Sequence, residues 1–426
     1  MIRFFLTGLL SLFFSPLFTQ VDNLSLNDCY EWARTADPQL HNTTILAEMT
    51  ELRIDNLDAA RLPDLQLAGQ VSYQSDVVAF PLEAPGLSLP QLPHERVQLT
   101  LDANYTLYDG GRIQARKDQE TARLYTEQHA IEVRLYQVRQ QVDQFYFGAL
   151  LARQQQATLQ TARDELEQRL QQLEAALQYG TITAADLSRL RVRALELDQQ
   201  RQAAEHREKA ALQSLAALTD TVFVEAPTLS LPGYQANLRN ASLARPELQH
   251  FALQRQQIEA NEALLTAQRQ PSVQLFLQTG LGYPNPLNFF DDSLSPFAMG
   301  GIRARWTITD WQQTHRQRQL LTLQTKVLDR QEASFRRQIA LGEAAYQTEL
   351  QQLLDQRAHL EDIRNLREGI LRESRSRLER GLITATDYLT DLNALLRVEQ
   401  SLDLVDLQLI REQVQYRTRY GLSTNN

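Results

Sequence analysis

Two long stretches of the chain carry the hydrophobic spacing of coiled-coil helices. Within 112–179, apolar residues recur at steps of four and three over residues 131–149, and the same steps continue over 159–177 with Arg163 as one interruption. This spacing places one apolar seam along a helix. Residues 312–379 form a second window of equal length, and neither window contains proline, which costs about 3 kcal/mol inside a helix. The pattern predicts two helices that are far longer than usual in globular proteins.

Between these helices the hydrophobic period changes from 3.5 to 2. Four segments alternate apolar and polar residues: Leu65–Tyr73, Val97–Tyr108, Val273–Leu281 and Ala298–Ile308. Segments of about ten alternating residues are typical of strands in a transmembrane barrel, whose apolar side faces lipid. A soluble antiparallel hairpin that packs one face on a core gives the same alternation, so one strand alone does not decide between the two. Four such strands in one chain favour the membrane interpretation.

The chain contains one layout twice. The segment Gly180–Leu187 returns 201 residues later as Gly381–Tyr388, with the glycine, an Ile-Thr-Ala run and the aspartate at matching places. Each copy combines a strand hairpin with long helices, which indicates one pseudo-symmetric structure rather than two unrelated domains. We therefore expect two tandem repeats, over residues 20–230 and 231–426.

Four strands from one chain cannot close a barrel, and open strand edges are not tolerated in lipid. Chains must therefore share strands. Eight strands, from a dimer, leave a lumen that side chains fill, so twelve strands, from a trimer, are the smallest number that leaves a conduit. The polar strand faces, with Asp102, Arg303 and Arg305, are then expected to line the barrel lumen.

Composition and charge narrow the class of protein. The 426 residues carry a formal net charge of −9, and the mean hydropathy is −0.40. Nucleic-acid binding requires a basic face, so the negative charge argues against a nucleic-acid partner. The low mean hydropathy argues against a helical membrane protein. Arg3 followed by the short apolar run Phe4–Phe14 predicts a signal peptide over residues 1–19, hence export; a buried N-terminal strand is the alternative.

No chemistry of catalysis or metal binding emerges from the motifs. The single cysteine, Cys29, excludes an intramolecular disulfide, and Asn27 and Asp28 before it argue against acylation, so a packed thiol is expected. The seven histidines show no metal-ligand spacing, and no phosphate-binding or nucleophile motif appears. Asp109-Gly110-Gly111 is interpreted as the turn from strand to helix. We expect no catalytic residue, metal or cofactor.

Several motifs together resemble one known family. They are the segments Leu107–Arg112 and Trp306–Trp311, the duplicated glycine-to-aspartate tips, and the opening Ser25–Ala33 with the Ala-x-Pro-x-Leu pattern that follows it. Their order over residues 24–422 is similar to that of the TolC-type outer membrane efflux proteins.

The resemblance implies a fold that is mainly α with a membrane β-barrel, in which a homotrimer closes a 12-stranded barrel and an α-helical tunnel. It implies an outer membrane channel of a tripartite efflux or type I secretion system, with its helical part in the periplasm. Such a channel conducts passively, is embedded in outer membrane lipid, and receives substrate from an inner-membrane transporter through a periplasmic adaptor (membrane fusion) protein. The loop with Asp291 and Asp292 then faces the cell exterior as a solvated loop rather than a metal site.

The helical tips are the expected site of control. Thr183 and Thr384 follow each tip glycine by three residues and are simple helix caps, with Asp186 and Asp387 favouring the positive N-terminal turn. In a trimer, three copies of Asp387 on one axis also form a ring that favours cations. The remaining expected aperture residues lie within one further turn, and the tips supply the adaptor contacts. The aperture set adds Arg189, Thr390 and Asp391, and the adaptor set is Tyr179, Gly180, Thr181, Thr183, Arg380, Gly381, Leu382 and Thr384.

A competing interpretation of the chain also accounts for the heptads and the signal peptide. A soluble periplasmic coiled-coil scaffold without a pore has both features. It does not account for two amphipathic hairpins at equivalent places in the two repeats.

Overall fold

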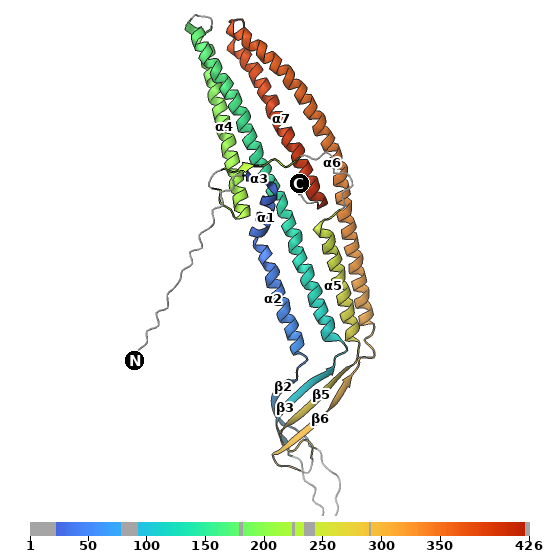
Figure 1. The fold of residues 1–426 in the computed structure, drawn as a ribbon. Coiled ribbons are helices and arrows are strands. Elements are labelled where there is room, and N and C mark those ends of the chain that lie inside the picture. The colour runs from blue at the N-terminus through green and yellow to red at the C-terminus, as the bar shows by residue number, and fades with distance from the viewer. Residues whose placement is uncertain are drawn as a thin grey trace, which may run out of the picture. The chain divides into compact units, whose positions relative to one another are not determined.

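The computed structural model describes residues 23–77, 93–178, 182–223, 226–233, 243–288 and 291–421. The expected signal peptide, residues 1–19, lies outside the described residues. Figure 1 shows the elements in chain order. The chain divides into two compact units. The helical unit contains residues 1–40, 134–245 and 336–426, and the sheet unit contains residues 41–133 and 246–335.

The order of elements repeats along the chain. The first set is α2 (Pro38–Ala59), β2 (Asp64–Tyr73), β3 (Glu95–Tyr108), α3 (Arg112–Gln178) and α4 (Ala184–Thr219). The second set is α5 (Pro246–Gln268), β5 (Ser272–Tyr283), β6 (Ser295–Arg305), α6 (Gln313–Glu379) and α7 (Ala385–Tyr420). Both α3 and α6 contain 67 residues, and both α4 and α7 contain 36. The two long helices predicted from the heptads and the absent prolines are confirmed.

The core of the helical unit follows the predicted heptad seam. Leu159, Leu166 and Leu173 of α3 are buried against Leu190 and Leu197 of α4. The interruption of the seam, Arg163, reaches Asp198 of α4 at 3.1 Å and Glu167 of its own helix at 2.6 Å. The cation therefore replaces an apolar residue without leaving a charge unpaired, which would be costly.

A second cluster of the helical unit holds the N-terminal elements in place. Strand β1 (Asn23–Leu24) pairs in parallel with β4 (Thr228–Leu229), and α1 (Leu26–Ala36) follows β1. Cys29 of α1 is fully buried in this cluster beside Val142 and Tyr146. Burial raises the pKa of the Cys29 thiol to about 12, so the thiol stays protonated and the prediction of a packed, unreactive cysteine is confirmed.

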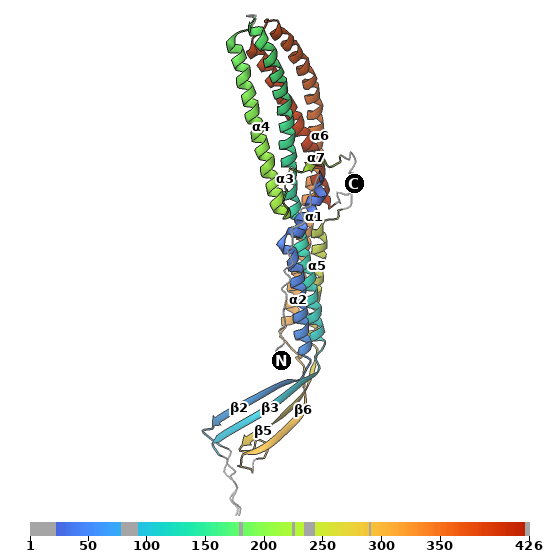
Figure 2. The same cartoon turned by 60° about the vertical axis from the view of Figure 1, so that its left-hand side comes forward.

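The sheet unit contains one antiparallel sheet in the order β2-β3-β5-β6, into which α2 and α5 lead and from which α3 and α6 depart (Figure 2). The register keeps the two predicted faces separate across all four strands, although Phe276 and Met299 lie on the mainly polar face. One row is Leu65, Ala103, Leu277 and Gly300, and the next is Gln66, Asp102, Gln278 and Met299. The predicted alternation is therefore a property of the whole sheet, with one apolar and one polar face.

The last strand is shorter than predicted. The alternation was expected to run to Ile308, but β6 ends at Arg305, which pairs with the first residue of β5, Ser272. Among the described residues no partner strand lies beyond that pair, and the chain turns instead toward α6. The Trp306 indole donates to the carbonyl of Arg269 at 3.1 Å, which fixes this exit.

The turns from strand to helix are equivalent in the two repeats but differ in residue type. Gly110 and Gly111 have φ of 72° and 79°, and their counterparts Trp311 and Gln312 have φ of 51° and 65°. Only glycine adopts this left-handed region without strain. The carboxylate of Asp109 accepts from the N–H groups of the first helical turn, including Ile113 at 2.6 Å, so the prediction of a turn rather than a ligand loop is confirmed.

The described helices are mostly polar on their surfaces. Among them, none combines the length and the apolar character that a membrane span requires.

Candidate functional site

The second helical tip, between α6 and α7, is closed by a left-handed glycine. Gly381 has φ of 69°, its N–H donates to the carbonyl of Leu378 at 2.9 Å, and the N–H of Leu382 donates to that of Arg377 at 2.9 Å. This pair of bonds is the Schellman motif, which satisfies the last carbonyls of α6. At the first tip, Tyr179, Gly180 and Thr181 lie outside the described residues, so the placement of those three predicted contacts is open.

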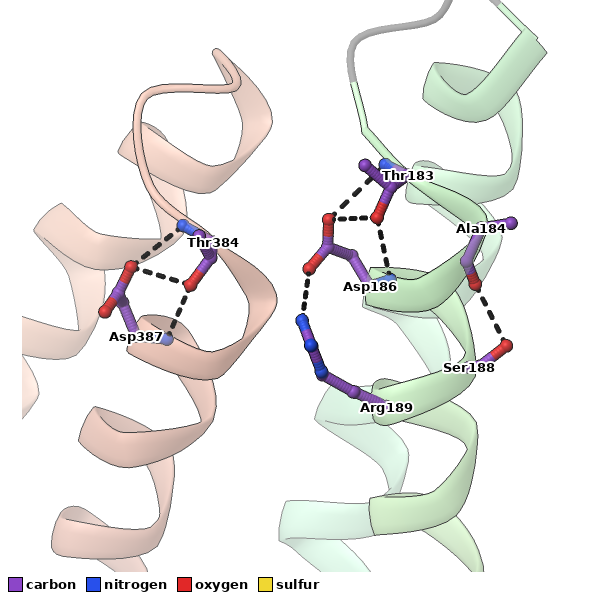
Figure 3. A network of polar contacts seen from close by, with 7 residues as sticks. All are labelled: Thr183, Ala184, Asp186, Ser188, Arg189, Thr384 and Asp387. Carbon is purple, nitrogen blue, oxygen red and sulfur yellow. Dashed lines mark hydrogen bonds and ion pairs between the residues drawn. The ribbon is translucent and has the colours of Figure 1, made fainter.

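Each tip restarts its helix with the same reciprocal cap, shown in Figure 3. At the first tip the N–H of Asp186 donates to Thr183 Oγ1 at 3.1 Å, and the Thr183 hydroxyl donates to Asp186 Oδ2 at 2.6 Å. At the second tip the corresponding distances between Asp387 and Thr384 are 3.3 and 2.7 Å. Both threonines thus form capping boxes with an aspartate in the third helical position.

The caps hold both carboxylates ionised. Hydrogen bonds from the Thr183 hydroxyl lower the pKa of Asp186, and those from the Thr384 hydroxyl lower the pKa of Asp387. A lowered pKa means that the negative charge is present throughout the neutral range. The sequence therefore places one stable negative charge at the start of α4 and one at the start of α7.

The two charges differ in what surrounds them. Arg189 Nη1 lies 3.1 Å from Asp186 Oδ1, one turn along the same helix, and both are drawn in Figure 3. The residue at the matching place of the second tip is Thr390, whose exposed hydroxyl donates to the carbonyl of Thr386 at 2.9 Å. Asp387 is exposed and is bonded to Thr384 alone in the contacts that the structure gives it.

Asp391 does not extend the charged surface of the second tip. Its carboxylate accepts from the Ser374 hydroxyl of α6 at 2.5 Å, inside the helical hairpin, and the residue is half-buried. The Asp391 side chain is thus engaged between α6 and α7, whereas Asp387 lies on the surface. Of the predicted aperture residues, Asp186 and Arg189 are brought together as one ion pair, Asp391 is separate from them, and Asp387 carries the unneutralised charge.

The tips rest on one hydrophobic cluster that joins both hairpins. Tyr388, at the position that matches Leu187 of the first copy, is fully buried there with Ala385. Ile182 and Ile383, the residues before the two capping threonines, pack against the same cluster. The capped helix starts are therefore held by packing as well as by hydrogen bonds.

Two ion pairs between α3 and α6 were not anticipated from the sequence. Arg375 pairs with Glu165, and Arg169 pairs with Glu379. The order of charges along α3, Glu then Arg four residues later, is reversed along α6, so both pairs form at once. The reversed order of charges is visible in the sequence. It predicts the two ion pairs only if α3 and α6 are already known to be neighbours. We call these four residues the charge clasp.

The exposed residues at the second tip are available for contact. Leu382 is exposed although it is a large apolar side chain, and the Arg380 guanidinium donates to the carbonyl and hydroxyl of Ser376 at 3.1 and 3.0 Å. Gly381 and Thr384 are also exposed. Leu382 is therefore the one large apolar side chain among these exposed tip residues.

The three predicted lumen residues all lie on the polar face of the sheet. Asp102 accepts from Thr100 Oγ1 at 2.9 Å and from Gln278 Nε2 at 2.6 Å. The Arg303 guanidinium lies 4.9 Å from the centre of the Phe276 ring on the neighbouring strand, and Arg305 is exposed at the end of β6. The register puts these residues on the same side as Gln66.

The opposite face of the sheet is apolar and uncovered. Large exposed side chains on it include Leu67, Val71, Leu101, Leu281 and Ile302. An uncovered apolar face of this size is not typical of a soluble protein and marks a surface for lipid or protein. The alternation thus gives a sheet with one polar face and one exposed apolar face.

Hydrogen bonds within the loop between β5 and β6 satisfy its acidic side chain Asp291. The carboxylate of Asp291 accepts from the N–H and hydroxyl of Ser293 at 3.2 and 2.6 Å. Within the described ranges, no group of three or more histidine, cysteine or acidic side chains is placed to hold a metal ion.

Comparison with known proteins gives the class of this chain. Residues 30–221 match the family model described as outer membrane efflux protein. No curated protein sequence matches the chain closely enough to count as a relative.

Solved structures match nearly the whole chain. The channel-forming protein CusC matches at a TM-score of 0.68 and 16% identity, over 95% of this chain and 94% of its own. The outer membrane protein VceC of Vibrio cholerae matches at 0.67 and 17%, over 94% and 97%. The open state of the outer membrane channel MtrE of Neisseria gonorrhoeae matches at 0.64 and 16%, over 94% and 91%.

The fold is therefore that of the TolC-type outer membrane channels. Residues 30–221 match the outer membrane efflux protein family and the fold agrees over nearly the whole chain, so the resemblance inferred from the motifs is confirmed. The members of this family are outer membrane transport channels with a periplasmic helical part, and they are not enzymes. The expected location and the expected class of function are confirmed with it.

Proposed function

We propose that three copies of this chain form the exit duct of a tripartite efflux or type I secretion system. Each copy contributes four strands to a 12-stranded barrel and its long helices to a periplasmic tunnel. Substrate passes through without chemical change. The observation that carries the proposal is the sheet with its two unlike faces, because its apolar face needs lipid and its polar face needs water.

The free strand edges support sharing between copies. In the sheet order β2-β3-β5-β6, the outer strands β2 and β6 each have one side without a partner strand among the described residues. Unpaired backbone groups are not tolerated in lipid, so β2 of one copy must pair with β6 of another. The directions of the strands make that pairing antiparallel, like the three pairings within the chain.

The domain organisation belongs to the same proposal. We assign residues 1–19 to a signal peptide and residues 20–230 and 231–426 to two outer membrane efflux repeats. The matching order and lengths of α3, α4, α6 and α7 support the two repeats. Both compact units draw on both repeats, so neither repeat has a separate core.

The tips are the proposed site of partner contact and of control. A periplasmic adaptor, which delivers substrate from an inner-membrane transporter, packs between neighbouring tips and touches Arg380, Leu382 and the capped helix starts. Three Asp387 side chains near the axis make the entrance favour cations. Asp186 and Arg189 line the first tip as a neutral pair.

The mass of the protein tests this proposal. Membranes are extracted first with high salt and then with mild detergent, and the detergent-corrected mass is measured by light scattering. Release by detergent alone with a mass of three chains is the expected result. A salt-released monomer or dimer would reject the duct and favour the periplasmic scaffold.

A further inference from the structure

The polar face of the sheet carries an aromatic ring and a guanidinium in direct contact. Phe276 of β5 lies across from Gly301 of β6, and Arg303 is two residues further along β6 on the same face. The Arg303 guanidinium lies 4.9 Å from the centre of the Phe276 ring. This separation is within the range of a cation–π contact, so the two side chains form one composite surface.

A glycine makes room for this contact. A Cβ atom added to Gly301 would lie 3.1 Å from both Cε1 and Cζ of Phe276, so the ring lies directly over the glycine backbone. The ring therefore reaches from β5 to the strand that carries Arg303. Diagonal neighbours across two strands are within reach of aromatic and long side chains. The position of the ring is thus set by the register and by the missing side chain at Gly301.

The charge of Arg303 has no acidic partner. Among the described residues, its side chain contacts the aromatic ring and forms no ion pair. The residues paired at its level are Gln274 of β5 and Thr106 of β3, which are neutral. Asp64 and Asp102, the acids on this face of the strands, accept hydrogen bonds from glutamine side chains instead. The guanidinium therefore keeps hydrogen-bond donors for a ligand.

Apolar side chains continue this surface along β6. Met299 and Phe297 lie four and six residues before Arg303, on the same face. Met299 is 42% exposed, whereas Phe297 is buried. Because a strand rises about 3.4 Å per residue, Arg303 and Met299 are about 14 Å apart, with the Phe276 ring between their levels. The surface has a cationic end and an apolar end.

The chemistry of these side chains selects one class of ligand. A guanidinium binds the acidic group of a carboxylate or sulfonate through two parallel hydrogen bonds. An aromatic ring stacks on a second ring, and a thioether adapts to irregular apolar shapes. An inorganic anion would use the cationic end alone, and an uncharged apolar molecule would leave the guanidinium without its anion.

We propose that Arg303 and Phe276 form a binding site for amphipathic organic anions, which have one acidic group and a planar apolar body. Arg303 binds the acidic group, and Phe276 and Met299 contact the apolar body. This inference rests on the proposed duct, in which the polar face lines the lumen, and it names a class of substrate that the barrel binds. Each copy supplies one complete site, and no residue of the tips takes part.

Current block measures binding in the full-length channel. The protein is reconstituted into planar bilayers, and 2-naphthalenesulfonate is added on the side opposite to that of protein addition, from which the barrel is reached without passing the polar helices. The half-blocking concentration is compared with those of methanesulfonate, which has the acidic group without the ring, and 2-naphthol, which has the ring without the charge. Light scattering gives the mass of each purified protein.

The expected result is a block by 2-naphthalenesulfonate at about one tenth of the concentration that either matched probe requires. Arg303→Gln is expected to raise the half-blocking concentration about tenfold, because the charge-assisted hydrogen bonds are lost. Phe276→Leu is expected to raise it about threefold, because the cation–π surface is lost, and Phe276→Tyr to leave it unchanged. The matched control is Arg305→Gln, which removes the same charge from the same face of β6, where no ring among the described residues contacts it.

Two results would overturn the site. One is an unchanged half-blocking concentration in Arg303→Gln, and the other is an equal rise in Arg303→Gln and Arg305→Gln without any rise in Phe276→Leu. With a mass of three chains, either result leaves the duct intact, whereas a different mass would overturn the duct and the site together. If Arg303→Gln does not assemble, Arg303→Lys keeps the charge without the planar fork, and an unchanged block in that variant would also overturn the site.

Discussion

The two tips of the molecule share one cap and differ in charge balance. Thr183 with Asp186 and Thr384 with Asp387 have the same hydrogen bonds to within a few tenths of an ångström. Arg189 neutralises the first carboxylate, and Thr390 stands in its place at the second. The backbone N–H of Ala385, from the second hairpin, also stabilises the charge of Asp186.

This difference distinguishes the capping boxes, which start helices, from the charge of Asp387, for which we propose a role in transport. A third capping box, Ser25 with Asp28, begins α1 with the same geometry although it is not at a tip. The box alone therefore reports only how a helix starts. The unneutralised charge of Asp387 is specific to the second tip, and we propose that it is the charge that permeating ions encounter.

Burial of a carboxylate is a second difference between the repeats. Asp143 of α3 is buried, accepts from the Tyr30 hydroxyl, and leaves Oδ2 without a hydrogen-bond partner, whereas Ala344 stands 201 residues later. Burial raises the pKa of Asp143 to about 6 from its usual 3.8. Because the folded pKa lies above the unfolded one, ionisation destabilises the fold as pH rises from about 4 to 6.

Asp143→Asn is expected to have the largest effect on stability. It removes the ionisation penalty, so the variant should gain up to about 3 kcal/mol at pH 7.5 and almost nothing at pH 4. Guanidinium titrations followed by circular dichroism at the two pH values measure the difference. An equal change at both values would show that the effect comes from packing and not from charge.

Breaking the charge clasp should give the next largest effect. Arg169→Met leaves Glu379 without its partner across the two hairpins, at an expected cost of about 1–2 kcal/mol in the same titration. Arg377→Met is the matched control, because the ion pair of Arg377 in the described part of the chain is with Glu373, on an exposed face of its own helix. A similar loss in both variants would mean that the clasp does not join the hairpins.

Removing the caps tests the equivalence of the tips. Thr183→Ala and Thr384→Ala are each expected to cost about 1 kcal/mol. The pKa values of Asp186 and Asp387 are lowered in the fold, so this contribution is present above pH 4 and fades as pH falls through the lowered values. Unequal costs at pH 7 would reject the view that the two caps are alike.

The smallest effect is expected at the turn from strand to helix. Gln312→Gly gives the second repeat the residue type that the first repeat has at Gly111, and relief of the left-handed backbone should stabilise by up to about 1 kcal/mol. The reverse change, Gly111→Gln, is its mirror control and should destabilise. Heat-induced loss of helical signal compares the two variants.

Local patterns in the sequence were enough for most of the fold. The heptads, the missing prolines and the period of two gave the long helices and the four strands, because each pattern acts within one element. The end of β6 was wrong by three residues, since the alternation continues to Ile308 but the partner strand begins at Ser272. A strand requires a hydrogen-bonding partner strand as well as alternating apolar and polar residues.

The site was predicted less completely, for a physical reason. The caps follow from spacing within one helix, so Thr183 and Thr384 were identified correctly as caps. The pairing of Arg375 with Glu165 and the engagement of Asp391 by Ser374 depend on which helices are neighbours. Such long-range contacts are not visible in a single sequence.

The central claim is that the free charge of Asp387 sits on the conduction path. Its most direct test is the reversal potential of the reconstituted channel in a salt gradient, for the natural protein and for Thr390→Arg. That substitution copies the Arg189 arrangement at the second tip without touching the cap, and Thr390→Gln is its neutral control. The account predicts a cation-selective channel whose preference falls clearly in Thr390→Arg and stays unchanged in Thr390→Gln. An identical reversal potential in all three proteins would contradict it.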